Sequence, residues 1–519
     1  MPFPPMRASI RAALLTATLL AGAGLAAGPA LAQCATTTNA MTLQFVNDRS
    51  DAASLPVYVT FGGANAPCAT INGSNAPVQQ GVSYDMSTLT SGITVTDVSS
   101  GRIFLSLGAP LTSDTSANGY APNFNNPNLG DFTTRWDKFE MDFSSATAAG
   151  GANLTAQDFF ALPMRISTTG GTAAPTTLTT TASASAMFNV LGGLSNFSTD
   201  TTANATGAIA AGNNGVTVNG INAVRVIAPA TVAPTDAQGN TVYPSMANYL
   251  QFLRTGNAGN PVTANIAGSN GQPVSGGAFQ TYNLTAEIVN VAGTYGGISA
   301  QPGDLVIFGT INNGDGSGDQ AFGLQVLAAN MSDSMIYGAN PPYSVAVGAD
   351  FNSVANKIIA DYFAALNFGL LGSDEINPNN AAANLPAGTT IGNSPSWSWY
   401  GNTPDGSPLP ELPVTDAFAA AQPGHTDYYN EYAGYLTSVS DVYGFAYNDR
   451  LQSPLAALAN GSVLTLTLLD DNQADTVVGG GLAQVPEPAS LLLLAAGLSG
   501  LGLARRRVGR GCCCPPSGP

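Results

Sequence analysis

Our prediction of the fold starts from the stretch TTRWDKFEMDF, residues 133–143. Five of its residues are charged, although the whole 519-residue chain holds only 15 basic and 32 acidic residues. As a β-strand, the stretch would place alternate side chains on opposite faces. The apolar face would pack on a core, so the charged face should line an open surface. The first face would carry Phe139, Met141 and Phe143, and the second Trp136, Lys138, Glu140 and Asp142.

Short β-type runs surround this stretch between residues 41 and 166. They are separated by Gly, Pro, Asn and Ser, and they read LQFVND, LPVYVTFGG, ITVTDV, GRIFLSLG, KFEMDF and FFALPMRI. Many short strands with such turns predict a β-sandwich or barrel. Residues 168–215 are rich in Thr, Ala, Ser and Asn, and they predict a loop-heavy connection with one apolar island, MFNVLGGL.

The pattern changes near residue 220. A strand at AVRVIAP, a helical run at YPSMANYLQFL, further strands and a helix over 350–371 predict an α/β region. Strands return near VYGFAYND and SVLTLTLLD. We therefore expect a mainly β protein with a groove between two domains. The expected limits are 33–219 for the β domain (loop-rich after 168), 220–372 for an inserted α/β domain, and 373–480 for the return to the β domain.

The two ends of the chain predict export. Residues 1–32 combine a charged start, an apolar centre and an Ala-x-Ala exit, which is typical of a secretory signal peptide. Residues 485–510 hold a Pro-Glu-Pro motif, an uncharged segment slightly short for a bilayer, and an arginine block that would stay on the cytoplasmic side. This order of parts resembles the PEP-CTERM sorting tail of Gram-negative bacteria. The motif residues are Pro486, Glu487, Pro488, Arg505, Arg506 and Arg507.

The resemblance of the tail implies a partner and a location. An exosortase-type processing enzyme would act near the Pro-Glu-Pro. The chain would be anchored transiently in the inner membrane, through this tail alone. It would then reach the cell surface or the medium of a Gram-negative bacterium.

Composition narrows the partners and the chemistry. A formal net charge of −17 would repel nucleic acid and anionic membranes but would not affect a neutral ligand. The single histidine, His425, and the lack of a G-x-S-x-G elbow argue against Ser-His-Asp and Cys-His mechanisms. No zinc motif occurs, and residues 312–320 resemble a polar turn more than a calcium loop, so we expect no cofactor. Cys34 and Cys68 are a natural disulfide pair in an oxidising compartment.

Two carboxylates in the β region could act as a pair. Glu140 lies on the charged face, and Asp158 precedes the apolar run FFALP. If their strands are neighbours, the two acids could flank one cleft. Glycoside hydrolysis requires such a pair, because one acid protonates the leaving oxygen and the other activates water or attacks carbon. Trp136 would then stack on a sugar ring. The alternative is a solvated strand face with a ladder of ion pairs.

Residues 41–166 resemble the thaumatin-like β-1,3-glucanases of glycoside hydrolase family 64, the laminaripentaose-producing type. The similarity rests on FVND with VYVTF, on SGRIFLSLG, on TRWDKFE, and on the N-x-T-x-x-D-F-x-x-x-P pattern that begins at Asn153. VRVIAP, YYNEYAG and YGFAYND match more loosely. The resemblance implies a thaumatin-like β-sandwich or barrel with an inserted α/β domain and a wide groove. It also implies inverting hydrolysis of a laminarin-like polysaccharide.

The same resemblance assigns roles to residues. By motif, Glu140 would be the general acid and Asp158 the general base. Trp136, Asp142, Asn153 and Thr155 are expected to bind substrate. Asp142 stands where family members tend to have a small hydroxyl residue. The alternative function is a non-catalytic glucan-binding or extracellular matrix protein of the same fold, since long polar loops and a sorting tail suit it equally well.

Overall fold

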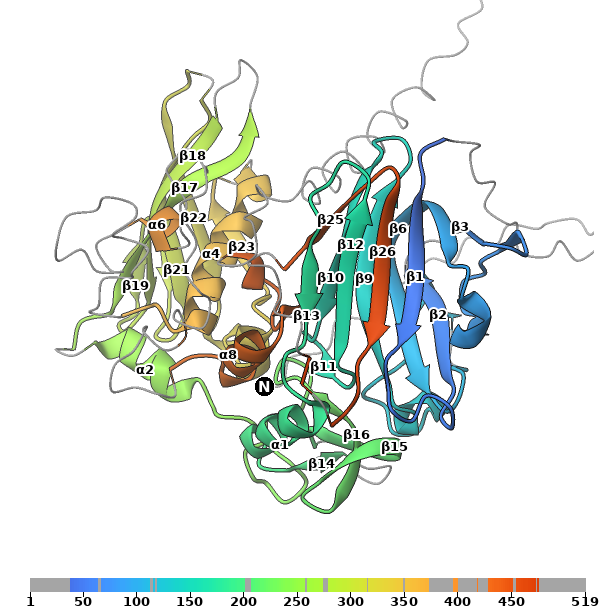
Figure 1. Ribbon diagram of the computed structural model, residues 1–519. Helices are drawn as coiled ribbons and strands as arrows, with labels where there is room; N and C mark the ends of the chain where they lie inside the picture. Colours follow the sequence, from blue (N-terminus) through green and yellow to red (C-terminus); the bar gives the residue numbers. More distant parts are fainter. Residues whose placement is uncertain are drawn as a thin grey trace, which may run out of the picture.

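The computed structural model describes residues 38–475, with gaps at 64–66, 113–114, 117–118, 201–206, 257–258, 274–278, 315, 349–350, 373–394, 400–417, 419–427, 451–453 and 473. The predicted signal peptide, Cys34, His425 and the tail at 485–510 lie outside the described residues. Strands dominate the described chain and helices are few, so the prediction of a mainly β protein is confirmed (Figure 1). Within the described residues, no helix has the length and hydropathy needed to cross a bilayer.

The largest sheet joins fifteen strands of the described chain. These strands curl into a barrel-like unit around one hydrophobic core. They are β1 (Met41–Asn47), β2 (Val57–Gly63), β3 (Cys68–Ile71), β4 (Ala76–Pro77), β5 (Ser83–Asp85), β6 (Ile93–Leu107), β7 (Thr115–Ser116), β8 (Gly119–Tyr120), β9 (Trp136–Ser144), β10 (Ala149–Thr155), β12 (Met164–Gly170), β13 (Thr177–Thr179), β24 (Val442–Tyr443), β25 (Ala456–Ala459) and β26 (Ser462–Leu468).

Strand β6 is shared by two parts of this sheet. The sequence suggested two separate strands, ITVTDV and GRIFLSLG, but the structure joins them into one strand of 15 residues. Its first half pairs with β1 and β3, and its second half pairs with β2 and β9. A register shift between Val98 and Gly101 bends the strand at the change of partners.

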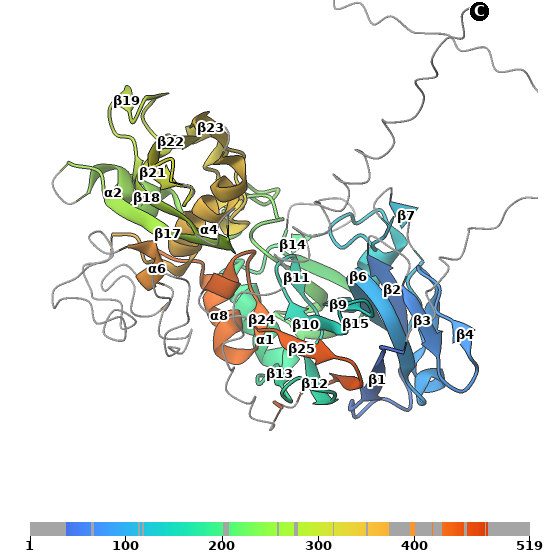
Figure 2. The same cartoon turned by 90° about the horizontal axis from the view of Figure 1, so that it is seen from above.

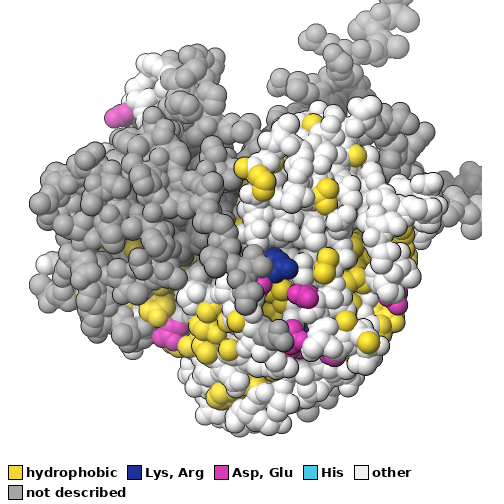
Figure 3. All heavy atoms as spheres, viewed as in Figure 1, with side chains coloured by type: hydrophobic (Ala, Val, Ile, Leu, Met, Phe, Trp, Pro, Cys, Tyr) yellow, Lys and Arg dark blue, Asp and Glu magenta, His cyan; other side chains and the backbone are white. Residues whose placement is uncertain are grey.

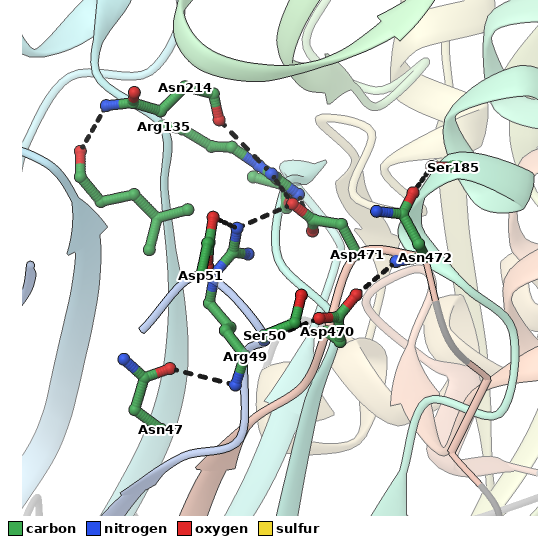
Figure 4. Close-up of polar contacts among 12 residues, drawn as sticks. Asn47, Arg49, Ser50, Asp51, Arg135, Ser185, Asn214, Asp470, Asp471 and Asn472 are labelled. Carbon is green, nitrogen blue, oxygen red and sulfur yellow. Dashed lines mark hydrogen bonds and ion pairs between the residues drawn. The ribbon is translucent and has the colours of Figure 1, made fainter. Parts of the chain in front are cut away.

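The first and last described strands lie side by side (Figure 1). β1 pairs with β26 in parallel, and β26 also pairs with β12. An ion cluster fixes the residues that follow these strands (Figure 4). Asp471 binds Arg135 through both oxygens, at 2.6 and 2.7 Å, and also binds Arg49 at 3.0 Å. Asp470 accepts the backbone N–H of Ser50 at 2.7 Å, so the two ends of the domain are joined by charge as well as by strand pairing.

A smaller sheet packs over the start of β9. Its strand order is β11 (Phe159–Phe160), β16 (Ile221–Ile227), β15 (Ile209–Val218) and β14 (Thr199–Asp200). β11 follows β10 in the chain, and β16 returns some sixty residues later to pair with it. Phe159, Val226 and Ala228 belong to the same hydrophobic core as Trp136. This second layer decides which part of β9 remains open.

A second hydrophobic core lies beside the first in both views (Figures 1 and 2). It fills the space between an antiparallel sheet and the helix α4 (Asn352–Phe368), which ends at Gly369 in a left-handed conformation, φ 75°. The face of α4 predicted from Val354, Ile358, Tyr362 and Ala365 is buried there. The sheet consists of β17 (Thr263–Pro273), β18 (Phe279–Ile288), β21 (Leu305–Asn312), β22 (Asp319–Val326) and β23 (Ser344–Val347), with the hairpin of β19 (Gly293–Tyr295) and β20 (Ile298–Ala300) nearby.

The remaining helices connect these units. α8 (Glu431–Val439) contributes Tyr432 and Leu436 to the first core and Ala433 to the second. The others are α2 (Ala247–Thr255), α3 (Asp333–Tyr337), α6 (Ser396–Trp399), and the 3₁₀ turns η1 (Met86–Leu89), η2 (Gly130–Thr133), η3 (Ala328–Asn330) and η6 (Asn448–Arg450). The loop at 312–320 is the turn of the β21–β22 hairpin.

The prediction of a loop-heavy connection over 168–215 is wrong. This segment holds the end of β12, β13, the helix α1 (Ala184–Leu194) and part of β15. Ser183 caps α1 by accepting the N–H of Ala186 at 3.2 Å. Met187, Phe188 and Leu191 are buried at helical spacing, a pattern that small neighbouring residues concealed in the sequence. The domain limits predicted above stay a prediction.

Candidate active site

β9 presents two different faces, as its sequence predicts for the second half of the strand. Phe139, Met141 and Phe143 are buried in the core. Glu140 and Asp142 lie on the opposite face and are partly exposed. Charged side chains are sparse on the protein face shown in Figure 3, where a few basic and acidic groups gather near its centre. On the described part of this face, carboxylates that reach the surface are few.

The prediction that Trp136 stacks on a sugar is wrong. Its side chain is 1% exposed, because the smaller sheet covers this end of β9. Phe159 lies edge-on to its ring at 4.9 Å, and the guanidinium of Arg225 lies 5.1 Å from the ring centroid. The indole Nε1 donates to the carbonyl of Asp131 at 3.0 Å. Trp136 is thus a core residue of the folded protein.

Glu140 is held by a cation on the neighbouring strand. It pairs in register with Arg102 of β6 on one side and with Asn153 of β10 on the other. The Nε of Arg102 lies 3.1 Å from Oε1 of Glu140, and the Glu140 side chain is 34% exposed. The Oδ1 of Asn153 is buried and has no hydrogen-bond partner among the described residues. An acceptor without a donor beside a part-exposed acid suits a ligand hydroxyl.

Asp158 is held by the lysine of β9. It lies between β10 and β11, and its Oδ2 lies 2.8 Å from Nζ of Lys138. The Lys138 side chain is 5% exposed, whereas that of Asp158 is 37% exposed. Nζ also lies 4.5 Å from the ring centroid of Phe159. Lys138 and Glu140 share one face of β9 at i and i+2, so the anchor of Asp158 stands about 7 Å along the strand from Glu140.

The charges around Asp158 keep it ionised. Partial burial alone would raise the pKa of this carboxyl. The charge and hydrogen bond of Lys138, with a smaller contribution from the charge of Arg102, outweigh burial and hold the pKa of Asp158 below its ordinary value. Arg102 therefore acts on both acids, by direct contact with Glu140 and through its field on Asp158.

Asp142 and Thr155 occupy more structural positions than the sequence suggested. The carboxylate of Asp142 accepts the backbone N–H of Ser100 at the bend of β6, and burial raises its pKa. Thr155 is buried and pairs in parallel with Tyr443 of β24. Their roles as substrate contacts, like that of Asn153, stay predictions. Cys68 is disulfide-bonded, and its predicted partner, Cys34, lies outside the described residues.

Buried charges beneath the site hold its two layers together. Asp137 accepts the backbone N–H groups of Ala161 and Leu162 at 2.7 and 2.9 Å, which ties the segment after β11 to β9. Arg225 of β16 donates to the carbonyls of Phe132 and Thr134, each at 2.7 Å. These contacts fix the position of β11 on β9, and so the place of Asp158 relative to Glu140.

Sequence reasoning missed Arg102, Lys138 and Arg225 as residues of the site. Arg102 could have been found by pairing SGRIFLSLG with KFEMDF, because the bend in β6 brings it opposite Glu140. Lys138 was predicted on the charged face of β9, but its contact with Asp158 was not predicted. Arg225 had no local signal, since its partners lie some ninety residues earlier in the chain.

A described cavity lies elsewhere. It is lined by Pro229, Val232, Ala233, Pro234, Tyr243, Ser332, Asp333, Ser334 and Tyr337. Its walls come from the segment after β16 and from α3, and they include neither Glu140 nor Asp158. Within the described part of the chain, no group of three or more His, Cys, Asp or Glu side chains is arranged to hold a metal ion.

Comparison with known proteins gives three results. The family model for β-1,3-glucanase, glycoside hydrolase family 64, matches residues 35–385, more than half of the chain. The PEP-CTERM protein-sorting motif matches residues 484–507, which indicates export and sorting in a Gram-negative bacterium. No match was found among curated protein sequences.

Solved structures give weaker similarities. A β-1,3-glucanase domain from Clostridium beijerinckii has 14% identity and a TM-score of 0.48, with 83% of this chain and 98% of that chain covered. A laminaripentaose-producing β-1,3-glucanase in complex with laminaritetraose has 16% identity and a TM-score of 0.45, with 83% and 99% covered. A laminaripentaose-producing enzyme from Paenibacillus barengoltzii has 16% identity and a TM-score of 0.42, with 83% and 75% covered.

The match to the family model decides the classification. It spans β1 to α4 and therefore includes β9, which carries Glu140, and the segment between β10 and β11 that carries Asp158. The chain belongs to the β-1,3-glucanases of glycoside hydrolase family 64, and it is a glycoside hydrolase that carries a PEP-CTERM sorting motif.

Proposed function

We propose that this enzyme is an endo-β-1,3-glucanase that cleaves laminarin-like polysaccharide with inversion, using Glu140 as general acid and Asp158 as general base. One observation carries this assignment. The two carboxylates are part-exposed, and the same strand face supports both, directly for Glu140 and through Lys138 for Asp158. Family membership supplies the substrate class.

The proposed reaction is a single displacement. Asp158 removes a proton from water, and the water oxygen bonds to the anomeric carbon. The glycosidic C–O bond breaks, and its electron pair goes to the leaving oxygen. That oxygen takes the proton of Glu140. Arg102 contacts Oε1 of Glu140, so the proton that Glu140 donates would be carried by Oε2.

The surroundings of the acids suit a neutral sugar. Asn153 pairs in register with Glu140 across the β9–β10 ladder, which makes it a candidate for contact with the sugar. Asp142 and Thr155 are further candidates for sugar contact. A negatively charged protein attracts no polyanion, and a neutral glucan is not repelled by it.

The proposal extends to architecture and location. We propose a thaumatin-like β domain with an inserted α/β domain, consistent with the two hydrophobic cores. An exosortase-type enzyme would process the tail around the sorting motif. Before that step the tail would anchor the protein transiently in the inner membrane.

Isosteric replacement of each acid tests the assignment. We expect Glu140→Gln and Asp158→Asn to lower kcat on laminarin by about 10²- to 10⁴-fold, because each removes proton transfer while preserving shape. KM should stay near the wild-type value in both variants, and the unfolding midpoint should be unchanged in Glu140→Gln. Asp158→Asn should unfold more easily, because the buried Lys138 loses its counter-charge. Proton NMR of the first product should show the α-anomer. Activity within tenfold of wild type in either variant, or a β-anomeric first product, would contradict the mechanism.

A further inference from the structure

Lys138 is an unusual residue in this chain. The sequence contains only two lysines, Lys138 and Lys357, and Lys138 is the buried one. A buried ammonium is costly unless a counter-charge and hydrogen bonds compensate it. Lys138 finds both in Asp158, at 2.8 Å, and a further contact with the ring of Phe159 at 4.5 Å. Its side chain therefore has one fixed position.

Asp158 is fixed at two points. Its carbonyl accepts the backbone N–H of Ala228 at 2.8 Å and the hydroxyl of Thr231 at 3.3 Å, which holds the backbone against β16. Its Oδ2 is held by Lys138. Among the described residues, nothing donates a hydrogen bond to its Oδ1. One oxygen is thus anchored, and the other is available to a water molecule at a part-exposed site.

We propose that Lys138 is the positioning residue of the general base: it anchors Oδ2 of Asp158 so that Oδ1 faces the attacking water. This inference rests on the proposed role of Asp158. In the step, the water proton goes to Oδ1 while the water oxygen bonds to the anomeric carbon. The ammonium keeps its own protons throughout.

The groups that face Asp158 support this assignment. Lys138 on β9 and Arg102 on β6 are cations, and Arg102 is already bonded to Glu140. Tyr432 on α8 donates its hydroxyl to the carbonyl of Ala156, and burial together with nearby acids keeps its pKa far above the ordinary value, so it stays neutral. Among the side chains that the structure describes, only Lys138 contacts the Asp158 carboxylate, and its effect on the pKa of Asp158 exceeds that of Arg102.

Replacement of Lys138 gives a pH signature. Lys138→Met keeps the chain length of the side chain and its contact with Phe159 but removes the charge. We expect kcat to fall by about 10- to 100-fold with KM within about twofold, because the base loses its alignment. The pKa of Asp158 should rise, so the acidic limb of the kcat profile should move to higher pH. Lys138→Arg keeps the charge, so the acidic limb should stay near its wild-type position. Lys357→Met is the matched control, in which neither kcat nor the acidic limb should change.

A second measurement does not depend on the folding of Lys138→Met. In Lys357→Met protein labelled with ¹⁵N-lysine, the one remaining lysine signal belongs to Lys138. We expect this signal to titrate with the acidic limb and to lose that step in Asp158→Asn, while the separate step of the neighbouring Asp137, whose pKa is about 6, remains. A Lys138 signal that titrates identically with and without the Asp158 carboxylate would overturn the proposal. A folded Lys138→Met enzyme whose kcat profile keeps the wild-type acidic limb would also overturn it. If Asp158→Asn stays active while the Lys138 signal of the parent protein follows the titration of Asp158, the assignment of Asp158 as general base fails. The contact between Lys138 and Asp158 then stands.

Discussion

Asp137 is the most deeply buried acid of β9. Its carboxylate accepts three backbone N–H groups, from Lys138, Ala161 and Leu162. Burial raises its pKa to about 6, although the charge of Lys138 and the three backbone donors act in the opposite direction. The protein therefore holds an acid that titrates near neutrality one residue away from the lysine that supports the site.

This raised pKa predicts a pH-dependent stability. A folded pKa near 6 against about 3.9 in the unfolded chain means that the folded state binds the proton more tightly. The stabilisation is full below pH 4 and is lost as pH rises to about 6, by about 3 kcal/mol. Urea denaturation between pH 4 and 8 would measure it. In Asp137→Asn this part of the pH dependence should vanish. If the unfolding free energy changes with pH equally in both proteins, the prediction is contradicted.

At the residue scale, the sequence predicted the faces of β9 only where one layer covers the strand. The burial of Phe139, Met141 and Phe143 followed from alternation. Trp136 and Lys138 obey the same alternation but are covered from the other side by residues of β11 and β16. No local sequence pattern predicts that these two side chains are covered, because β16 lies far along the chain. The acid pair could be nominated from sequence, but Arg102 could be assigned to Glu140 only by pairing the two strands, and the contact of Lys138 with Asp158 had no local signal.

At the scale of elements, the bend in β6 sets the register of the site. Ser100 has a positive φ of 49°, and Asp142 accepts its backbone N–H. Beyond the bend, Arg102 stands opposite Glu140. A β-bulge re-aims the side chains that follow it. Asp142 therefore helps to place Arg102 on the neighbouring strand.

We expect Asp142→Ala to lower the free energy of unfolding by about 1–2 kcal/mol, because the Ser100 N–H would lose its acceptor. It should reduce kcat as well, through displacement of Arg102. Asp142→Asn keeps a side-chain oxygen and should retain most of the stability. Urea denaturation and steady-state kinetics on laminarin would separate the two roles. A rise in KM alone, with unchanged stability, would show that Asp142 contacts substrate instead.

The elements were predicted unevenly for physical reasons. The helix α4 was predicted because a long apolar stripe at helical spacing is unambiguous. The helix α1 was missed because Ala, Gly and Ser dilute its stripe. The two runs of β6 seemed separate because Ser-Ser-Gly resembles a turn, whereas here it forms a bend within one strand.

At the scale of the whole molecule, the sorting tail and the enzyme domain are separable in sequence. β26 ends at Leu468, the Arg135–Asp471 pair follows it, and the sorting motif begins at residue 484. A 33–485 fragment should therefore be soluble and fully active. A fragment ending at Asn460 loses β26, which lies between β1 and β12, and it should not fold. Fractionation, circular dichroism and laminarin hydrolysis would check both. An inactive 33–485 fragment would show that the tail contributes to the domain.

The parallel pairing of β1 with β26 also has a kinetic consequence. These strands are more than 400 residues apart, so the barrel cannot close until nearly the whole chain has been made, and a contact of such range forms slowly. The sorting motif follows β26 by fewer than twenty residues. Under the transient anchoring proposed above, translocation would deliver the strand that completes folding and the anchoring tail at almost the same moment. That anchoring would give β26 time to pair before the protein is released.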